Sequence, residues 1–260
     1  LSIDRYRDKT AANYSSHSLA LQILNRRKAR RILDIGCGPG HVAAQCEQMG
    51  MRVTGVDSSI PIPDSMSEFL TVDLERDSLP VKMSDFDAVI MLDVIEHLEN
   101  PEEFLLALRN EDSHDKTELP VLILSTPNVA FAAIRLNLLM GRFNYAERGI
   151  LDITHKRLFT RKSLLRMMTD CGFEVEQVHA VGVPFEAVMP GSMGCALGTV
   201  ANLLARIWPC MFAFQFLLEC RPKPGVRQVL CNAFWIHEAD AAHDSGINLQ
   251  AMSLHDRPRR

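Results

Sequence analysis

The chain has 260 residues, a mass of 29.2 kDa, and 47% apolar and 23% charged residues, as an ordinary globular protein has. This composition excludes a wholly disordered, collagen-like or coiled-coil chain. The net charge of −4 and the pI near 6.2 argue against a general nucleic-acid-binding protein. The seven cysteines include no Cys-x-x-Cys pair, which favours a reducing compartment over a disulfide framework or a thiolate metal site.

The N-terminal part of the chain is polar and basic. Residues 1–31 carry eight Lys and Arg against two acidic residues, so we expect no signal peptide and a cytoplasmic protein. A helix is predicted over His17–Arg27. We expect residues 1–30 to form a helical cover on a single domain that spans 1–260.

Five short apolar runs follow, and each is typical of a strand buried on both faces of a parallel sheet. The predicted strands are Arg31–Gly36, Met51–Asp57, Phe69–Asp73, Phe86–Asp93 and Val121–Ser125. Segments of helical length, His41–Met49 and Pro101–Asn110, lie between them. Strands that alternate with helices predict a Rossmann-like, doubly wound α/β fold with a mostly parallel sheet.

The remaining elements complete a sheet of seven strands. Thr160 is suited to cap a helix that ends at Gly172. Phe173–Val181 alternates apolar and polar residues, which predicts an edge strand, and Gln228–Trp235 supplies the last strand.

Two helical insertions interrupt this pattern, at 128–160 and 190–224. Insertions of this kind carry the acceptor site in such sheets. Cys195–Cys220 is strongly apolar, but Arg206 and Pro209 divide it into pieces too short to cross a bilayer. We therefore expect 195–220 to form either a helical lid over the acceptor pocket or a membrane-interface segment, giving peripheral contact at the inner face of the membrane.

A glycine-rich loop follows the first predicted strand. Its glycines are Gly36, Gly38 and Gly40. Glycine lets the backbone approach a ligand closely, although Gly40 comes one residue earlier than in a dinucleotide-binding loop. Asp34 precedes this loop, and Asp57 ends the second strand, where a carboxylate accepts hydrogen bonds from ribose hydroxyls. Asp73 ends the third strand, where it can meet an adenine edge.

In combination, these segments resemble class I S-adenosylmethionine-dependent methyltransferases of small-molecule and glycan pathways. The matching segments are Leu33–Gly40, Val56–Asp57, Val72–Leu74, Phe86–Leu98, Ser125–Asn128 and Gly172–Phe173. The resemblance covers roughly residues 10–180 and the final strand, and it implies S-adenosyl-L-methionine as the cofactor. A nicotinamide-dependent reductase and a non-catalytic Rossmann-like binding module are the alternatives.

The resemblance also implies which residues hold the cofactor. Asp34 lies near the ammonium group of the methionine moiety, and Asp57 binds the ribose. Asp73 and Leu74 contact the adenine, whereas Tyr14 either covers the methionine end or only packs. The other implied cofactor-binding residues are Gly36, Gly38, Gly40, Leu92 and Asp93.

Histidines are the predicted catalytic residues, because imidazole is a suitable base for a hydroxyl near neutral pH. We expect His155 to act as the base, the alternative being a hydrogen bond to the loop before the Thr160 helix. His97 is a second candidate, with a structural or cofactor-side role as its alternative. The segment Leu92–Leu98 lacks the Asn/Asp-Pro-Pro-Tyr pattern of enzymes that methylate amines on nucleic acids.

The acceptor is therefore expected to be a small molecule, a sugar or a lipid-linked glycan intermediate that is methylated on oxygen. Methylation of nitrogen or carbon is a lesser alternative, and neither a nucleic-acid partner nor a metal site is predicted. Basic side chains match a phosphate or carboxylate on the acceptor, although a solvated surface position is the more common role of any one such residue. The predicted acceptor-side residues are Asn128, Arg135, Arg142, Lys156 and Arg157.

Overall fold

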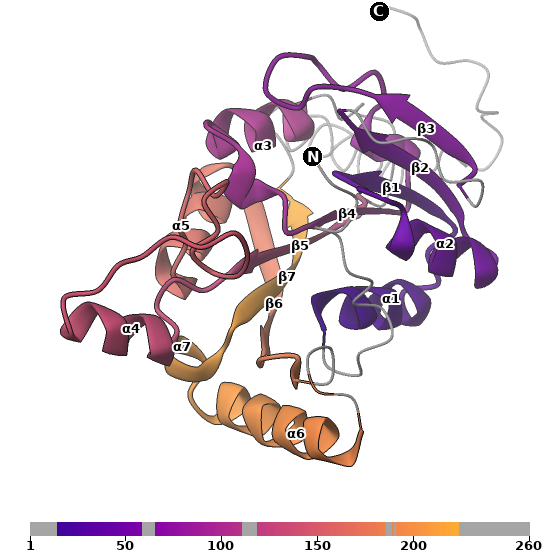
Figure 1. Cartoon of the computed structure of the whole chain (residues 1–260). Coiled ribbons are helices and arrows are strands. Elements are labelled where there is room, and N and C mark those ends of the chain that lie inside the picture. The colour runs from indigo at the N-terminus through magenta and orange to yellow at the C-terminus, as the bar shows by residue number, and fades with distance from the viewer. Residues whose placement is uncertain (1–14, 59–65, 111–118, 186–188, 190, 224–260) are drawn as a thin grey trace, which may run out of the picture. The chain divides into compact units, whose positions relative to one another are not determined.

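The computed structural model describes residues 15–58, 66–110, 119–185, 189 and 191–223. The chain divides into two units, Leu1–Pro222 and Lys223–Arg260, and all described residues except Lys223 belong to the first unit. In that unit, helices cover both faces of one seven-stranded sheet (Figure 1).

Every strand and helix predicted from residue 16 to residue 181 is present, with slightly shifted ends. The strands are β1 (Arg31–Ile35), β2 (Arg52–Asp57), β3 (Glu68–Thr71), β4 (Ala88–Leu92), β5 (Val121–Pro127), β6 (Phe173–Val181) and β7 (Gln215–Pro222). The α-helices are α1 (Ser16–Arg26), α2 (His41–Gln48), α3 (Pro101–Asn110), α4 (Ala132–Leu139), α5 (Arg161–Asp170), α6 (Ser192–Ile207) and α7 (Pro209–Phe212). Two 3-10 helices are η2 (Met83–Asp85) and η3 (Ile95–His97).

The strand order is β3-β2-β1-β4-β5-β7-β6. Strands β1 to β5 run parallel to one another, whereas β7 is antiparallel to both β5 and β6. The predicted Rossmann-like, mostly parallel sheet of seven strands is therefore confirmed, and β6 lies at its edge as expected.

The central strands consist of continuous apolar runs because both of their faces are buried. In β4, Val89 and Met91 pack in one core with residues from α3 and α5. Ala88 and Ile90 point to the opposite core, which contains residues from α1 and α2. Because β4 and β5 are buried along their whole length, polar side chains collect where the strands end.

The helix before β6 is bounded as its sequence predicts. Thr160 is the N-cap of α5, and its hydroxyl accepts a hydrogen bond from the backbone N–H of Ser163 at 3.2 Å. Gly172 follows the helix with a φ of +80°, in the left-handed region that glycine adopts without strain.

One strand of the sheet, β7, was not predicted from the sequence. The predicted strand Gln228–Trp235 lies outside the described residues, and β7 falls within the insertion assigned to 190–224. Its Leu218 pairs with Leu124 of β5 and with Val178 of β6. The interpretation of 195–220 as a lid or interface segment missed this strand, because an apolar run fits a lid helix and a doubly buried strand equally well. The segment 195–220 therefore contains a helical part and the first residues of a core strand.

Phe216 provides a test of this corrected assignment. Its side chain is fully buried in the core shared with α3 and α5. We expect Phe216→Ala to lower the free energy of unfolding by about 3–5 kcal/mol, because it removes buried apolar surface and leaves a cavity. Phe143→Ala is the matched control, since Phe143 is 40% exposed and its loss should cost less than about 1 kcal/mol. Chemical denaturation measures both; a Phe216 variant as stable as the parent would contradict a core strand.

Candidate active site

The glycine loop turns the chain sharply from β1 into α2. Gly36, Gly38 and Gly40 have φ values of +70°, +52° and +79°, which other residues rarely adopt. The backbone N–H of Gly36 donates to the carbonyl of Val56 at 2.7 Å, which fixes the loop against the end of β2. A side chain at Gly36 would overlap that of Val94, so glycine is required there by space as well as by conformation.

Asp34 is a buried carboxylate near the end of β1. It is 4% exposed, and its Oδ2 has no hydrogen-bond partner among the described residues. Burial, helped by the negative charge of Asp57, raises the pKa of Asp34 to about 7. A buried carboxylate in this state favours a cation or a hydrogen-bond donor beside it.

Asp57 lies at the carboxyl end of β2, beside the glycine loop. Its two oxygens accept hydrogen bonds from the backbone N–H groups of Gly38 at 3.0 Å and Ser58 at 2.7 Å. These bonds hold the carboxylate in place without a positively charged partner. The side chain is therefore oriented before any ligand arrives.

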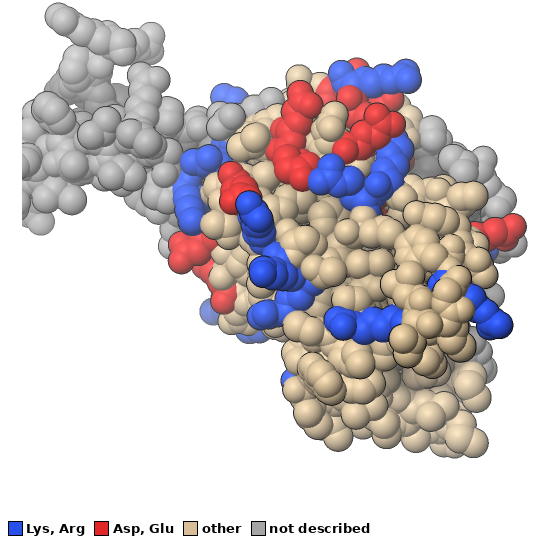
Figure 2. All heavy atoms as spheres, turned by 90° about the vertical axis from the view of Figure 1, so that its left-hand side faces the viewer, with Lys and Arg blue, Asp and Glu red and all other residues tan. Residues whose placement is uncertain are grey.

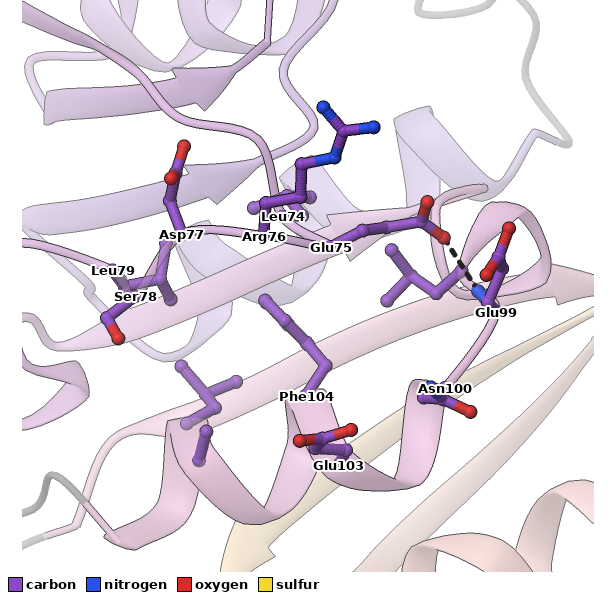
Figure 3. A pocket seen from close by; sticks show the side chains of 13 residues that line it. Leu74, Glu75, Arg76, Asp77, Ser78, Leu79, Glu99, Asn100, Glu103 and Phe104 are labelled. Carbon is purple, nitrogen blue, oxygen red and sulfur yellow. Dashed lines mark hydrogen bonds between the residues drawn. The ribbon is translucent and has the colours of Figure 1, made fainter.

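Asp73 and Leu74 follow β3, and Leu74 lies at the border of a hollow with a volume of about 250 Å³ (Figure 3). Asp73 accepts a hydrogen bond from the backbone N–H of Glu75 at 3.1 Å. Leu74 lines the hollow, whose other walls are the loop after β3 and the start of α3. The walls carry several acidic side chains: Glu75, Asp77, Glu99 and Glu103. Among the described residues predicted to bind the cofactor, Leu74 is the one that lines this hollow.

At the end of β4, Leu92 is buried and Asp93 adopts an unusual backbone conformation. The φ of Asp93 is +56°, in the left-handed region that costs a residue other than glycine energy. Its Oδ1 accepts hydrogen bonds from Ser125 Oγ at 2.7 Å and from Gln215 Nε2 at 2.9 Å. Residues of β5 and β7 thus hold the end of β4 in this conformation.

The two predicted catalytic histidines form a pair. The ring centroids of His97 and His155 are 4.8 Å apart in an edge-to-face arrangement. The Nδ1 atom of His155 lies 3.0 Å from the carbonyl of Ile150, and that of His97 lies 3.2 Å from the carbonyl of Thr154. A carbonyl accepts only, so each Nδ1 carries the proton and each Nε2 keeps its lone pair.

Burial and the neighbouring His155 lower the pKa of His97. His97 therefore stays neutral near neutral pH and adds no positive charge beside His155. The alternative given for His155, a hydrogen bond to its own loop, is present in the structure. This bond is compatible with a base, because it orients the ring and leaves Nε2 available.

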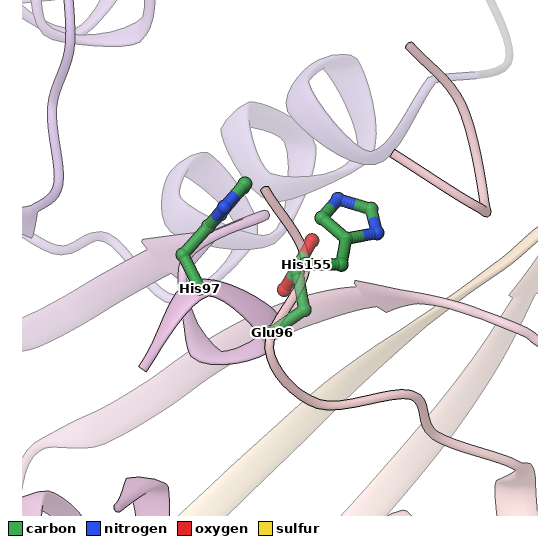
Figure 4. A group of neighbouring side chains, drawn as sticks. All are labelled: Glu96, His97 and His155. Atoms are coloured by element: carbon green, nitrogen blue, oxygen red, sulfur yellow. The ribbon is translucent and has the colours of Figure 1, made fainter. Parts of the chain in front are cut away.

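Glu96 completes this cluster, and the sequence prediction had missed it (Figure 4). Among the described residues, Glu96, His97 and His155 are the group with metal-binding atoms close together, all within 4.8 Å of one another. Glu96 is buried, and its Oε2 accepts a hydrogen bond from Thr126 Oγ1 at 3.0 Å. In the sequence, the only signal of this cluster was the pair of adjacent residues Glu96 and His97, because His155 is distant along the chain.

Most of the predicted acceptor-side residues are held by other parts of the protein. Asn128 is buried. Its amide nitrogen donates to the carbonyl of Ala213, and its amide oxygen accepts from the N–H of Ala130. Lys156 forms ion pairs with Glu75 and Glu99 at 2.8 and 2.9 Å.

The three arginines differ in their surroundings. Arg157 pairs with Glu102 at 2.5 Å, and Arg135 donates to the carbonyl of Cys210 at 3.3 Å. Arg142 is exposed. Tyr14, predicted to cover the cofactor, lies outside the described residues.

Comparison with known proteins identifies the class of this domain. A family model described as a methyltransferase domain matches residues 4–178. The chain belongs to this family and contains a domain of the S-adenosylmethionine-dependent methyltransferase class, as its sequence had suggested.

Individual relatives are distant. The ubiquinone biosynthesis O-methyltransferase of Rickettsia felis is 27% identical over 159 residues, which are 58% of this chain and 63% of the relative. The match thus spans less than two thirds of that relative's length.

Solved structures share the fold. Magnesium protoporphyrin IX methyltransferase from Synechocystis PCC 6803, with bound SAH, is 18% identical with a TM-score of 0.50, covering 80% of this chain and 82% of that one. The [4+2]-cyclase SpnF is also 18% identical, with a TM-score of 0.51 over 80% of this chain and 81% of its own.

The raised pKa of Asp34 predicts a stability that depends on pH. Its folded-state pKa of about 7 lies above the ordinary value of 3.8, so the folded protein binds the extra proton between these limits. The contribution of Asp34 to the free energy of unfolding therefore falls as pH rises from about 4 to 7, by roughly 1.4 kcal/mol per pH unit at most. Asp34→Asn removes this titration. Denaturation at pH 5 and pH 8 should show the variant gaining stability relative to the parent at the higher pH; an unchanged difference would contradict the buried titration.

Proposed function

We propose that this methyltransferase methylates a hydroxyl oxygen of a small organic acceptor, such as a sugar, a lipid-linked glycan or another pathway intermediate. The observation that carries this proposal is the orientation of His155, whose Nδ1 bonds a carbonyl and whose Nε2 keeps a lone pair. The distant relative's name, an O-methyltransferase, supports oxygen as the methylated atom. The net charge of −4 disfavours a nucleic-acid acceptor.

The residues at the ends of β1 and β2 fit S-adenosylmethionine. The buried Asp34 Oδ2, which has no partner among the described residues, suits the ammonium group of the methionine moiety. Asp57 is positioned to accept hydrogen bonds from ribose hydroxyls, and Asp73 with Leu74 would meet the adenine. Gly36 lets the backbone come close to the ligand.

The protein must remove the proton of the acceptor hydroxyl and align the oxygen of that hydroxyl with the methyl group of the cofactor. When bound, the cofactor supplies a methyl group on a positively charged sulfur. Nε2 of His155 would accept the proton of the acceptor hydroxyl as the oxygen of that hydroxyl takes up the methyl group. The electron pair of the broken methyl–sulfur bond would stay with the sulfur, which leaves as a neutral thioether. The carbonyl of Ile150 holds the ring in the tautomer that this step needs, and neutral His97 leaves His155 free to become charged.

We also propose that this protein is located in the cytoplasm and makes peripheral contact with the inner face of the membrane. The six described cysteines are free thiols, as expected of a reducing compartment. In the part of the chain that the structure describes, no helix is long and apolar enough to cross a bilayer.

Asp57 tests the position of the cofactor. We expect Asp57→Asn to weaken S-adenosylmethionine binding about 5- to 150-fold, because charge-assisted hydrogen bonds to the ribose are lost. Isothermal titration calorimetry measures the affinity. The exposed Asp85→Asn serves as the control and should bind as the parent does. Unchanged affinity in a folded Asp57 variant would exclude the assigned site.

His155 tests the mechanism once a screen with labelled methyl donor has found an acceptor. His155→Gln should lower kcat by about 10²- to 10⁴-fold while cofactor affinity stays near that of the parent. His179→Gln is the matched control, because His179 is a half-buried histidine on β6 that bonds Glu219. A His155 variant that keeps most of its activity would eliminate this base. Nuclear magnetic resonance of the product shows whether oxygen, nitrogen or carbon carries the new methyl group.

A further inference from the structure

Helix α6 presents its large apolar side chains to the outside of the molecule. Its buried positions are small or polar: Gly194, Gly198, Asn202 and Ala205. Its exposed positions carry Met193, Leu197, Val200, Leu203, Leu204 and Ile207. Leu203 is 57% and Ile207 71% exposed, and Trp208, which follows, is 57% exposed. This arrangement is the reverse of the usual amphipathic helix, whose large apolar residues face the core.

The packing of α6 on the end of β6 fixes this orientation. A Cβ atom at Gly182 would lie 2.7 Å from the backbone carbon of Ala201 and 2.8 Å from the backbone nitrogen of Asn202. The helix backbone therefore rests directly on the strand. Asn202 Oδ1 accepts a hydrogen bond from the Gly182 N–H at 2.9 Å, so a rotated helix would lose this buried bond.

The apolar surface continues from α6 over α7 to α4. Arg135 of α4 bonds the carbonyl of Cys210 in α7, and the rings of Phe131 and Phe214 are 5.8 Å apart. No residue of α4 is buried. Its exposed side chains, and those after it, include Leu136, Leu138, Leu139, Met140, Phe143 and Tyr145. We call the exposed side chains of α4, residues 140–145, α6 and Trp208 the apolar face.

The charged residues within the segments that form this face are all arginines. The segments 128–146 and 189–214 contain no Asp or Glu, and their charged residues are Arg135, Arg142 and Arg206. Figure 2 shows the side of the molecule on which α4 lies: acidic residues gather in its upper part, and the lower part is uncharged apart from scattered basic residues. An extended exposed apolar patch of this kind marks an interaction surface.

We propose that the apolar face docks on a bilayer that contains anionic lipids. A helix that lies in the interface plane buries its apolar side chains at the boundary of headgroups and acyl chains, with Trp and Arg at headgroup level. The three arginines complement anionic headgroups, each favouring binding near the surface. A second copy of this chain fits less well, because a self-complementary contact would bring the arginines of both copies together with no acidic residue of the face to pair them. Docking needs neither cofactor nor acceptor, so it stands apart from the proposed methyl transfer.

Co-sedimentation of the full chain with vesicles tests the proposal. We expect binding to vesicles of phosphatidylcholine mixed with phosphatidylglycerol, weaker binding to phosphatidylcholine alone, and a loss of binding as salt is raised. The double variant Leu203→Glu and Ile207→Glu should lower the partition coefficient at least about tenfold. Arg142→Gln with Arg206→Gln should lower it by about an order of magnitude on the anionic vesicles alone. Leu106→Glu, at an exposed leucine of α3 outside the face, is the matched control and should bind as the parent does.

Three results would overturn the proposal. The first is a parent protein that stays in the supernatant with both vesicle types at low salt. The second is a loss of binding in Leu106→Glu as large as in the double variant. The third is a dimer in analytical ultracentrifugation that the double variant dissociates, without vesicle binding by the parent.

Tryptophan fluorescence gives an answer that needs no change to the apolar face. Trp235→Phe leaves Trp208 as the single tryptophan of the chain. We expect its emission to shift to shorter wavelength on addition of the anionic vesicles and to be quenched by brominated lipids, because the indole enters the headgroup region. An unchanged spectrum would overturn the proposal. Calorimetry with S-adenosylmethionine on the same samples shows separately whether the cofactor site is intact.

Discussion

Burial of the central strands on both faces is the constraint that shapes this protein. It forces polar groups to the carboxyl ends of the strands, where Asp34, Asp57, Asp93 and His97 are found. The same burial shifts two of these groups toward neutrality, since it raises the pKa of Asp34 to about 7 and lowers that of His97. The burial that stabilises the core therefore also shifts the pKa values of Asp34 and His97 toward the neutral forms of these groups.

A second acidic group is buried within the sheet, and arginines at the end of the first helix compensate its charge. Glu219 of β7 is completely buried. Arg26 at the end of α1 and Arg27, the C-cap of that helix, reach its two oxygens at 2.6 Å. His179 of β6 lies 2.8 Å from the same carboxylate. Burial alone would raise the pKa of Glu219, but the hydrogen bonds from Arg26, His179 and Arg27 lower it. This network attaches α1 to the antiparallel strand, so the helical cover and the late strand depend on each other.

The sequence predicted the elements that local patterns define and missed those that depend on distant contacts. The strands β1 to β5 have apolar runs bounded by polar or turn residues, and β6 alternates apolar and polar residues. The helix α5 has a cap at Thr160 that needs only its neighbour Ser163. β7 was missed because its identity comes from pairing with β5, about ninety residues earlier in the chain. The contact of His97 with His155 is likewise invisible to any local pattern. Asp93 accepts hydrogen bonds from Ser125 and Gln215. The contact with Gln215 could be predicted only from the correct position of β7.

The uneven distribution of charge along the chain favours one orientation of the protein, in which the apolar face is turned toward an anionic surface. Residues 71–120 carry fourteen acidic against four basic residues, whereas the segments that form the apolar face carry arginine and no acidic residue. An anionic surface repels the first region and attracts the second, so both charges favour the same orientation of the protein. The insertion 128–160 contains α4 at one end and His155 near the other. One part of the proposed docking surface and the proposed base thus belong to one stretch of chain. Docking as proposed would bring this stretch to a lipid layer in which an acceptor with an apolar tail is concentrated.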